Sequence, residues 1–171
     1  AIEAAMQMLR IAPGMNRSFS AESYPAFPGD LWQYAREEAR SNVRSDSAFE
    51  VYASDIDPEC VRIATESARR AGVDTHVICR QANALDIVSD GRKGTIVTNP
   101  PYGERLMTQD EAMQLYRDMG RAFSALGRWQ IYVLTPNEEF ERLYGRRADK
   151  VRKLYNGMIP CLFYQFFKPK N

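Results

Sequence analysis

The residues best suited to chemistry stand together in one short segment, TNPPYG at positions 98–103. This segment follows residues 94–98, whose apolar and β-branched side chains predict a buried strand. An asparagine, two prolines and an aromatic residue in this order suit the methylation of an exocyclic amino group on a nucleic-acid base. We therefore take Asn99, Pro100, Pro101 and Tyr102 as candidate catalytic residues. The alternative is a proline-rich turn with Tyr102 packed in the core.

The chemistry of such a reaction explains these residue types. The lone pair of a base amine is delocalised into the ring, so it must be localised and aimed at the sulfonium methyl group of S-adenosylmethionine. The side-chain oxygen of Asn99 and the carbonyl of Pro100 can accept the two amine hydrogens, which favours a pyramidal nitrogen. The two prolines stiffen the loop. The Tyr102 ring offers a surface on which an unstacked base can lie.

Three further residues follow predicted strands and suit the binding of an adenosine. Asp55 ends the strand predicted at residues 49–54, where a carboxylate can accept hydrogen bonds from both ribose hydroxyls. Ile56 beside it can lie against the adenine, and the side-chain oxygen of Asn83 can accept from the adenine amino group. The alternatives are that Asp55 is a turn residue and Asn83 an ordinary loop asparagine.

The elements that must position these residues alternate between strand and helix. Strands are expected at residues 49–54, 76–79, 94–98 and 129–134, helices at 1–11, 30–43, 58–71, 109–126 and 137–144, and an antiparallel hairpin from 151–155 and 161–167. This alternation predicts an α/β fold with a Rossmann-like, doubly wound, mostly parallel sheet that ends in the antiparallel carboxy-terminal hairpin. Ligands of such sheets bind at the carboxyl ends of the strands.

Two of these helices carry clear signals for their ends. Asp57 can cap the helix that Pro58 opens, and Gly72 can close it. Thr108 and Glu111 have the spacing of a capping box, so they predict the start of the long helix near residue 109. On the helix expected at 30–43, the apolar residues fall on one face: Leu31, Ala35, Ala39 and Val43.

Composition narrows the class of protein further. The formal charge of +1 argues against polyanion binding by bulk charge, and the length suits one domain spanning residues 1–171. Cys60, Cys79, Cys161 and the single His76 are too scattered for a disulfide framework or a zinc site, so we expect no metal and a reducing, cytoplasmic location. No apolar stretch reaches the ~18 residues of a membrane span.

A basic cluster stands near the carboxyl terminus: Arg146, Arg147, Lys150, Arg152 and Lys153. Such a cluster can contact phosphates. In a nearly neutral chain, the simpler interpretation is a solvated loop and strand edge.

Three segments together resemble the bacterial ribosomal RNA large-subunit guanine-N2 methyltransferase family: TNPPYGERL at 98–106, IEAA at 2–5 and IAPGMNR at 11–17. The likeness covers essentially the whole chain. Members are often labelled adenine-specific DNA methylases because enzymes acting on adenine share the tetrapeptide. The GERL extension at 103–106 favours RNA guanine as the substrate.

The resemblance implies a role for each candidate residue. Asp55 would hold the ribose of S-adenosylmethionine, and Ile56 and Asn83 with Ala84 would hold its adenine. Residues 99–102 would hold the target base of ribosomal RNA, with Asn99 also counted among the cofactor-binding residues.

Family members carry a strand and a glycine-rich loop immediately before the equivalent of residues 1–3, preceded by an RNA-binding module. Neither is present here, so we expect a catalytic domain that is incomplete at its amino terminus. Two rival functions stay open: a DNA adenine methyltransferase, and a non-catalytic module that has lost cofactor binding.

Overall fold

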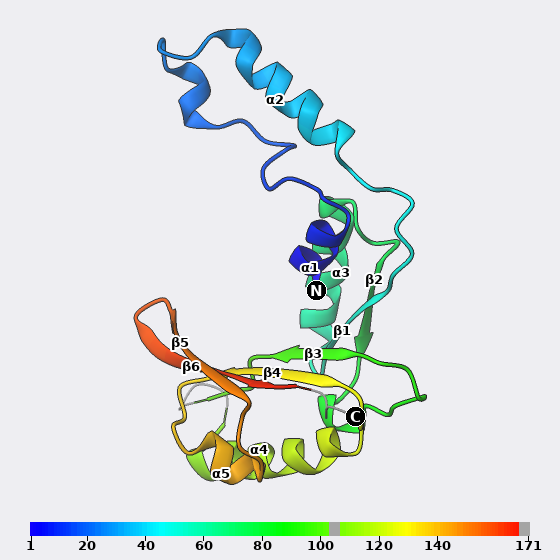
Figure 1. The fold of residues 1–171 in the computed structure, drawn as a ribbon, viewed down its shortest axis with the longest axis vertical. Coiled ribbons are helices and arrows are strands. Elements are labelled where there is room, and N and C mark those ends of the chain that lie inside the picture. Colours follow the sequence, from blue (N-terminus) through cyan, green and yellow to red (C-terminus); the bar gives the residue numbers. More distant parts are fainter. Residues whose placement is uncertain (103–106, 168–171) are drawn as a thin grey trace. The chain divides into compact units, whose positions relative to one another are not determined.

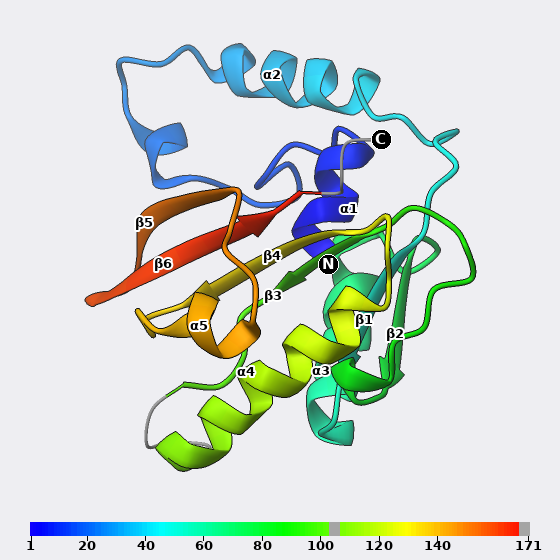
Figure 2. The ribbon, with the colours of Figure 1, turned by 60° about the horizontal axis from the view of Figure 1, so that its bottom comes forward.

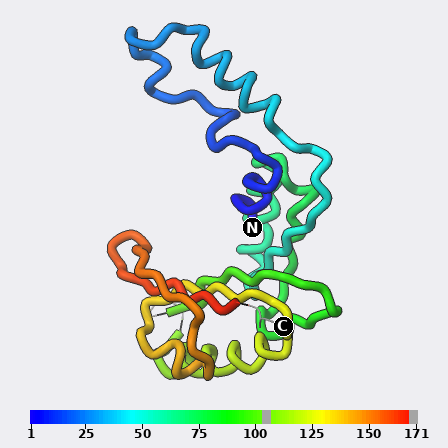
Figure 3. The backbone as a smooth tube through the Cα atoms, in the orientation of Figure 1, coloured from blue at the N-terminus to red at the C-terminus, as the bar shows by residue number. Residues whose placement is uncertain are grey.

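The computed structural model describes residues 1–102 and 107–167. The chain divides into two compact units, Ala1–Asn83 and Ala84–Asn171, which we call the first and second units. Figure 1 labels their elements, and Figure 3 follows the backbone from one terminus to the other. Within the described residues, no helix has the length and apolar character that crossing a membrane requires.

The first unit pairs two parallel strands, and α1 and α3 form a core with them. Its elements are α1 (Ile2–Met8), η1 (Ser20–Ser23), α2 (Gly29–Ser41), β1 (Val51–Asp55), α3 (Pro58–Ala71) and β2 (Val77–Gln81). Strand β1 runs parallel to β2 with Asp55 opposite Gln81, so both carboxyl ends lie at the same edge. The core of this unit joins α1, α3 and the start of β2 through Ala5, Leu9, Ala68, Val73 and Val77.

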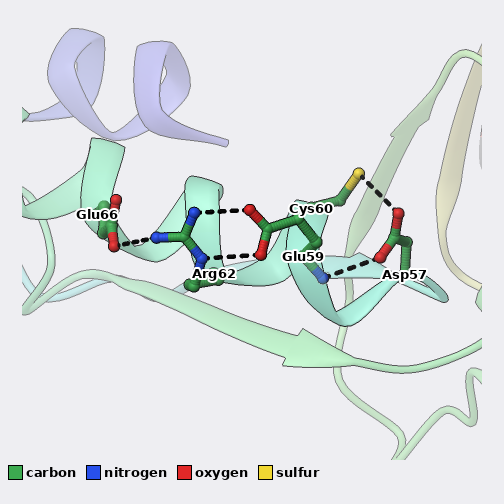
Figure 4. Close-up of polar contacts among 5 residues, drawn as sticks. All are labelled: Asp57, Glu59, Cys60, Arg62 and Glu66. Carbon is green, nitrogen blue, oxygen red and sulfur yellow. Dashed lines mark hydrogen bonds and ion pairs between the residues drawn. The ribbon is translucent and has the colours of Figure 1, made fainter.

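Helix α3 begins and ends where the sequence predicts. The Asp57 side chain accepts the Glu59 backbone N–H at 2.9 Å, Pro58 is the first helical residue, and Gly72 ends the helix with a φ of 70°. A positive φ costs glycine little because it has no Cβ. Figure 4 shows this cap, together with the exposed ion pairs of Arg62 with Glu59 and Glu66.

Helix α2 exposes a different face from the one expected. Ala39 is half-buried as predicted, and so is Val43, which follows the end of the helix, but Leu31 is 46% exposed and Ala35 is exposed. The covered side carries Trp32, whose ring stacks on Phe19 with centroids 5.7 Å apart and meets Phe27 edge to face at 6.2 Å. One turn later Arg36 pairs with Glu22. Aromatic stacking therefore decides which face is covered, because Trp32 buries more surface than Leu31 or Ala35 could.

The second unit is built on a mixed sheet with helices on one face. Its elements are η2 (Ala84–Asp86), β3 (Thr95–Thr98), α4 (Gln109–Ser124), β4 (Gln130–Thr135), α5 (Phe140–Tyr144), β5 (Lys150–Asn156) and β6 (Ile159–Phe166). The strand order is β3-β4-β6-β5, with β3 parallel to β4 and both pairs of β6 antiparallel. Figure 2 shows α4 and α5 on the same face of this sheet.

The core of the second unit lies between that face and the two helices. Helix α4 presents the apolar stripe expected of it, including Ala112, Tyr116, Met119 and Phe123, all buried. The capping box is present, with the Thr108 side chain accepting from the Glu111 N–H and the Glu111 side chain accepting from the Thr108 N–H. Together these features confirm the predicted start and inner face of α4.

The α/β class is confirmed, and so is the antiparallel carboxy-terminal hairpin, which β5 and β6 form. Among the described residues the strands pair in two sheets, one in each unit, with two parallel and two antiparallel pairs. Helix α5 begins at Phe140 and not at residue 137. The reason is that the Asn137 side chain accepts the Glu139 N–H at 2.8 Å and forms a turn before the helix.

Candidate functional site

The segment with the candidate catalytic residues leaves the carboxyl end of β3, as the sequence predicts. Thr98 lies opposite Val133 in the parallel β3-β4 pair, so this end of β3 shares an edge with the end of β4. Asn99 is exposed, whereas Pro100 is buried. Residues 103–106, the GERL segment that favours RNA guanine as the substrate, lie outside the described residues.

A chain of hydrogen bonds holds this loop from inside the second unit. The hydroxyl of Tyr116 lies 3.4 Å from the Pro101 carbonyl and 3.1 Å from the Thr135 hydroxyl, and Thr135 also accepts the Asn137 N–H at 3.3 Å. Tyr116 and Thr135 are both fully buried. Burial raises the pKa of Tyr116, which keeps its hydroxyl protonated and able to donate to Pro101.

A second bond holds the loop from the hairpin. Asn156, the last residue of β5, donates its side-chain N–H to the Tyr102 hydroxyl at 2.8 Å. The antiparallel pairing of β6 with β4 makes this contact possible, because it brings Leu162 opposite Thr135 and the hairpin turn to the edge where β3 ends. The Tyr102 ring is therefore fixed at its hydroxyl end.

Two other acceptors of the loop are not used by these bonds. Within the described residues, neither the Asn99 side chain nor the Pro100 carbonyl makes a hydrogen bond, whereas the Pro101 carbonyl and the Tyr102 hydroxyl both do. A groove beside the loop is lined by Tyr102, Tyr116, Asn137 and the first turn of α4. Tyr102 is the candidate catalytic residue that lines this groove, and its aromatic ring can stack on a planar base.

The predicted adenosine-binding residues of the first unit lie at the carboxyl edge of its own sheet. Asp55 ends β1 and is exposed, and one of its carboxylate oxygens accepts the Asp57 N–H at 2.9 Å. The next side chain, Ile56, is 70% exposed. Gln81 donates from its side chain to the Ile56 carbonyl at 3.0 Å and so fixes the backbone between them. An oriented carboxylate beside an exposed apolar side chain suits the ribose and the adenine face of an adenosine.

The remaining adenine-binding candidates follow β2. The Ala82 N–H donates to the Asp55 carbonyl at 3.0 Å, which joins the two strand ends just before Asn83. Asn83 is exposed and closes the first unit, and Ala84 opens η2 in the second. Asp55, Ile56 and Asn83 thus share one unit, and residues 99–102 belong to the other.

His76 precedes the amino end of β2, at the opposite end of this strand from Asn83. The His76 ring stacks on Phe49 with centroids 4.5 Å apart, and its Nδ1 lies 3.3 Å from the Phe49 carbonyl, a contact between neighbouring strands. Across the part of the chain that the structure describes, no three histidine, cysteine, aspartate or glutamate side chains gather where they could hold a metal ion.

Three residues that sequence reasoning missed support the candidate residues: Gln81, Tyr116 and Asn156. Tyr116 belongs to the predicted apolar stripe of α4, and nothing in that pattern distinguishes its hydroxyl from core packing. Asn156 is 54 residues from Tyr102 in the chain. Only the pairing of the hairpin with β4 indicates that the two are neighbours.

Comparison with known proteins gives the family. The model of the family described as "RMKL-like, methyltransferase domain" matches residues 1–165. The chain is 44% identical over 167 residues to "Putative RNA methyltransferase YpsC" of Bacillus subtilis (strain 168), which covers 98% of this chain and 43% of that protein. It is 37% identical over 169 residues to "Ribosomal RNA large subunit methyltransferase K/L" of Shewanella sp. (strain ANA-3), covering 95% of this chain and 23% of that protein.

A solved structure shares the same fold. SMU.472, described as "a putative methyltransferase complexed with SAH", superposes with a TM-score of 0.94 at 38% identity, over 99% of this chain and 45% of that one. The chain therefore spans less than half the length of each of these three proteins. With a family model that covers nearly all its residues, the chain belongs to the RMKL-like methyltransferase domain family.

Proposed function

We propose that the protein containing this domain transfers a methyl group from S-adenosylmethionine to the exocyclic 2-amino group of a guanine in large-subunit ribosomal RNA. The observation that carries the proposal is the order of the loop after β3. The exposed Asn99 side chain, which makes no hydrogen bond within the described residues, and the Pro100 carbonyl precede Tyr102, whose side chain lines a groove. The names of the two curated relatives support RNA as the substrate. The likeness of residues 98–106 to the guanine-N2 enzymes supports the choice of amine.

Asp55 and Ile56 are the residues that would hold the cofactor. A bound S-adenosylmethionine supplies an electrophilic methyl group on its sulfonium. The Asp55 carboxylate, oriented by the Asp57 N–H, accepts hydrogen bonds from the ribose hydroxyls, and Ile56 covers a face of the adenine. The side-chain oxygen of Asn83 accepts from the adenine amino group, and Ala84 lies next to it in the chain.

The catalytic loop would localise the electron pair of the target nitrogen. Asn99 and Pro100 each accept one amine hydrogen, so the lone pair turns away from the ring of the base. Tyr102 stacks on the base, a contact of about 1–3 kcal/mol. Tyr116 acts as a positioning residue, because its hydroxyl holds the Pro101 carbonyl, next to Pro100 in the loop.

Cofactor binding gives the direct test. Titration calorimetry with S-adenosylhomocysteine is expected to show about 10- to 100-fold weaker binding for Asp55→Ala, since hydrogen bonds to a charged group contribute about 1.5–3 kcal/mol. Asp74→Ala is the matched control. Asp74 is an exposed aspartate between α3 and β2, before the amino end of β2 and outside the proposed site. Equal affinities for the two variants would contradict the assignment of Asp55.

The substrate is tested by the modified nucleoside. Large-subunit ribosomal RNA lacking the modification and duplex DNA are incubated with the protein and S-adenosylmethionine, digested to nucleosides and analysed by mass spectrometry. We expect N2-methylguanosine from the RNA. N6-methyladenine from the DNA would replace this proposal with the adenine-directed one, and no transfer together with no cofactor binding would favour a non-catalytic module.

Tyr116→Phe tests the positioning role. The change removes one hydroxyl from a buried chain of hydrogen bonds, so we expect the free energy of unfolding to fall by about 1 kcal/mol. We also expect kcat to fall about tenfold with KM little changed, less than the ~10²-fold loss that a 1 Å misplacement costs. Thr135→Val is the control. It removes the bonds of Thr135 with Tyr116 and Asn137 but keeps the Tyr116 hydroxyl that bonds to the Pro101 carbonyl. If both variants lower kcat equally, Tyr116 acts only through stability.

A further inference from the structure

Strand β5 concentrates positive charge in a chain that is nearly neutral. Between positions 146 and 156 there are five basic residues and one acidic residue, against a net charge of +1 for the whole chain. Asp149 pairs with Arg146 at 2.9 Å. Within the described residues, no ion pair is made by the other four: Arg147, Lys150, Arg152 and Lys153. Their charge is therefore available to a partner.

The strand is also fully accessible. All seven residues of β5 are exposed, and β5 is the last strand in its sheet, hydrogen-bonded to β6. In Figures 1 and 3 the turn of the hairpin, drawn in orange, projects beyond the helices and the other strands of the second unit. Exposed hydrophobic residues continue the surface to the tip, where Tyr155 is 66% and Met158 95% exposed.

The direction of β5 connects this charge to the candidate catalytic loop. The strand ends at Asn156, whose side chain bonds to the Tyr102 hydroxyl at 2.8 Å. Because side chains alternate along a strand, Arg152 and Lys150 lie on the same face as Asn156, four and six residues away from it. At about 3.4 Å per residue, Arg152 and Lys150 lie about 14 and 20 Å along the strand from Asn156, which bonds to the loop. Lys153 lies on the opposite face, with its Nζ over the Tyr155 ring at 5.8 Å.

We propose that β5 is a docking surface for the RNA backbone next to the target nucleotide, with Lys150 and Arg152, on the face of Asn156, contacting phosphates. This inference rests on the proposed function for the identity of the nucleic acid. Phosphate contacts position a nucleic acid without reading its sequence, and a row of basic residues leading to the base-binding loop suits that task. Arg152 can also bind a phosphate through two N–H groups at once.

Lysines on an edge strand have another use, since they prevent edge-to-edge pairing between molecules. That role needs charge on the strand but no relation to the catalytic loop. If this is their role, variants that lack the positive charges of β5 should self-associate and should show no specific loss of RNA binding. Gel filtration of each variant therefore accompanies the binding measurements.

The test measures RNA affinity against salt. The probe is a fluorescein-labelled, single-stranded RNA of mixed sequence, about 20 nucleotides long, followed by anisotropy. Each lost phosphate contact lowers the slope of log K against log salt by about 0.7 for a single strand. We expect the double variant Lys150→Gln, Arg152→Gln to lower that slope by about 1.4, and Arg152→Gln alone to lower it by about 0.7. The matched control neutralises two exposed arginines elsewhere: Arg69 and Arg128.

The outcomes separate the docking surface from the proposed function. A lower slope in the β5 variants and an unchanged one in the control would support the proposal. Equal losses in both, no loss in either, or no binding by the unmodified chain would overturn it. If the double variant self-associates, the single variant decides. Titration with S-adenosylhomocysteine on the same samples tests the proposed function alone, because none of these residues is placed in the cofactor site.

Discussion

Asn99→Ala is expected to lower kcat for methyl transfer about 10²–10³-fold, the usual cost of removing one hydrogen-bonding group that stabilises a transition state. In our proposal the Asn99 oxygen accepts an amine hydrogen that becomes more acidic as the nitrogen attacks, so the bond strengthens during the reaction. A group that acts in this way lowers kcat and kcat/KM together when it is removed. Single-turnover transfer of a radiolabelled methyl group to RNA measures the effect.

Two controls make the Asn99 result specific. Asn99 is exposed and its side chain makes no hydrogen bond within the described residues, so Asn99→Ala should leave the free energy of unfolding within about 0.5 kcal/mol of the parent. Asn99→Asp keeps an acceptor oxygen in the same place and should retain more activity than Asn99→Ala. Equal activity of Asn99→Ala and the parent chain would remove Asn99 from the proposed mechanism.

Local signals in the sequence predicted the positions of the candidate residues well. Asp57, Pro58 and Gly72 bound α3, and Thr108 and Glu111 open α4, because caps depend on side chains within a few residues. Asp55 and Asn99 end up at carboxyl ends of strands for the same reason, since a short apolar run followed by Asp or by Asn-Pro marks where a strand stops. These features need no knowledge of the tertiary structure.

What the sequence could not supply are contacts between distant segments. The Tyr102 hydroxyl meets Asn156 only because β6 pairs with β4, and the Pro101 carbonyl meets Tyr116 only because α4 packs across the sheet. The prediction of the covered face of α2 was wrong in part, because periodicity treats Leu31 and Trp32 as equivalent apolar positions. The stacking of Trp32 on Phe19 depends on where residues 15–28 fold.

The close packing of α4 on α5 leads to the second large effect, on stability. A Cβ added at Gly120 would lie 2.0 Å from the Tyr144 carbonyl oxygen and 2.8 Å from its carbon, which are backbone atoms of α5. In an open helix Gly→Ala stabilises by about 1 kcal/mol, but forcing atoms into a packed core costs about 1–3 kcal/mol and occasionally more. Because backbone must move here, we expect Gly120→Ala to lower the free energy of unfolding by at least about 2 kcal/mol. Urea denaturation followed by circular dichroism measures it.

Gly29→Ala is the matched control, since Gly29 is the first residue of α2 and an added Cβ there meets nothing within 4 Å. It should leave stability unchanged or raise it slightly. The effect of Gly120→Ala should also reach the catalytic loop, because Tyr116 lies four residues earlier on the same face of α4 and bonds to the Pro101 carbonyl. If α4 moves away from α5, that bond lengthens and kcat falls with stability. An unfolding free energy equal to that of Gly29→Ala would contradict the contact between Gly120 and Tyr144, and a lower stability with unchanged kcat would show that α4 does not position the loop.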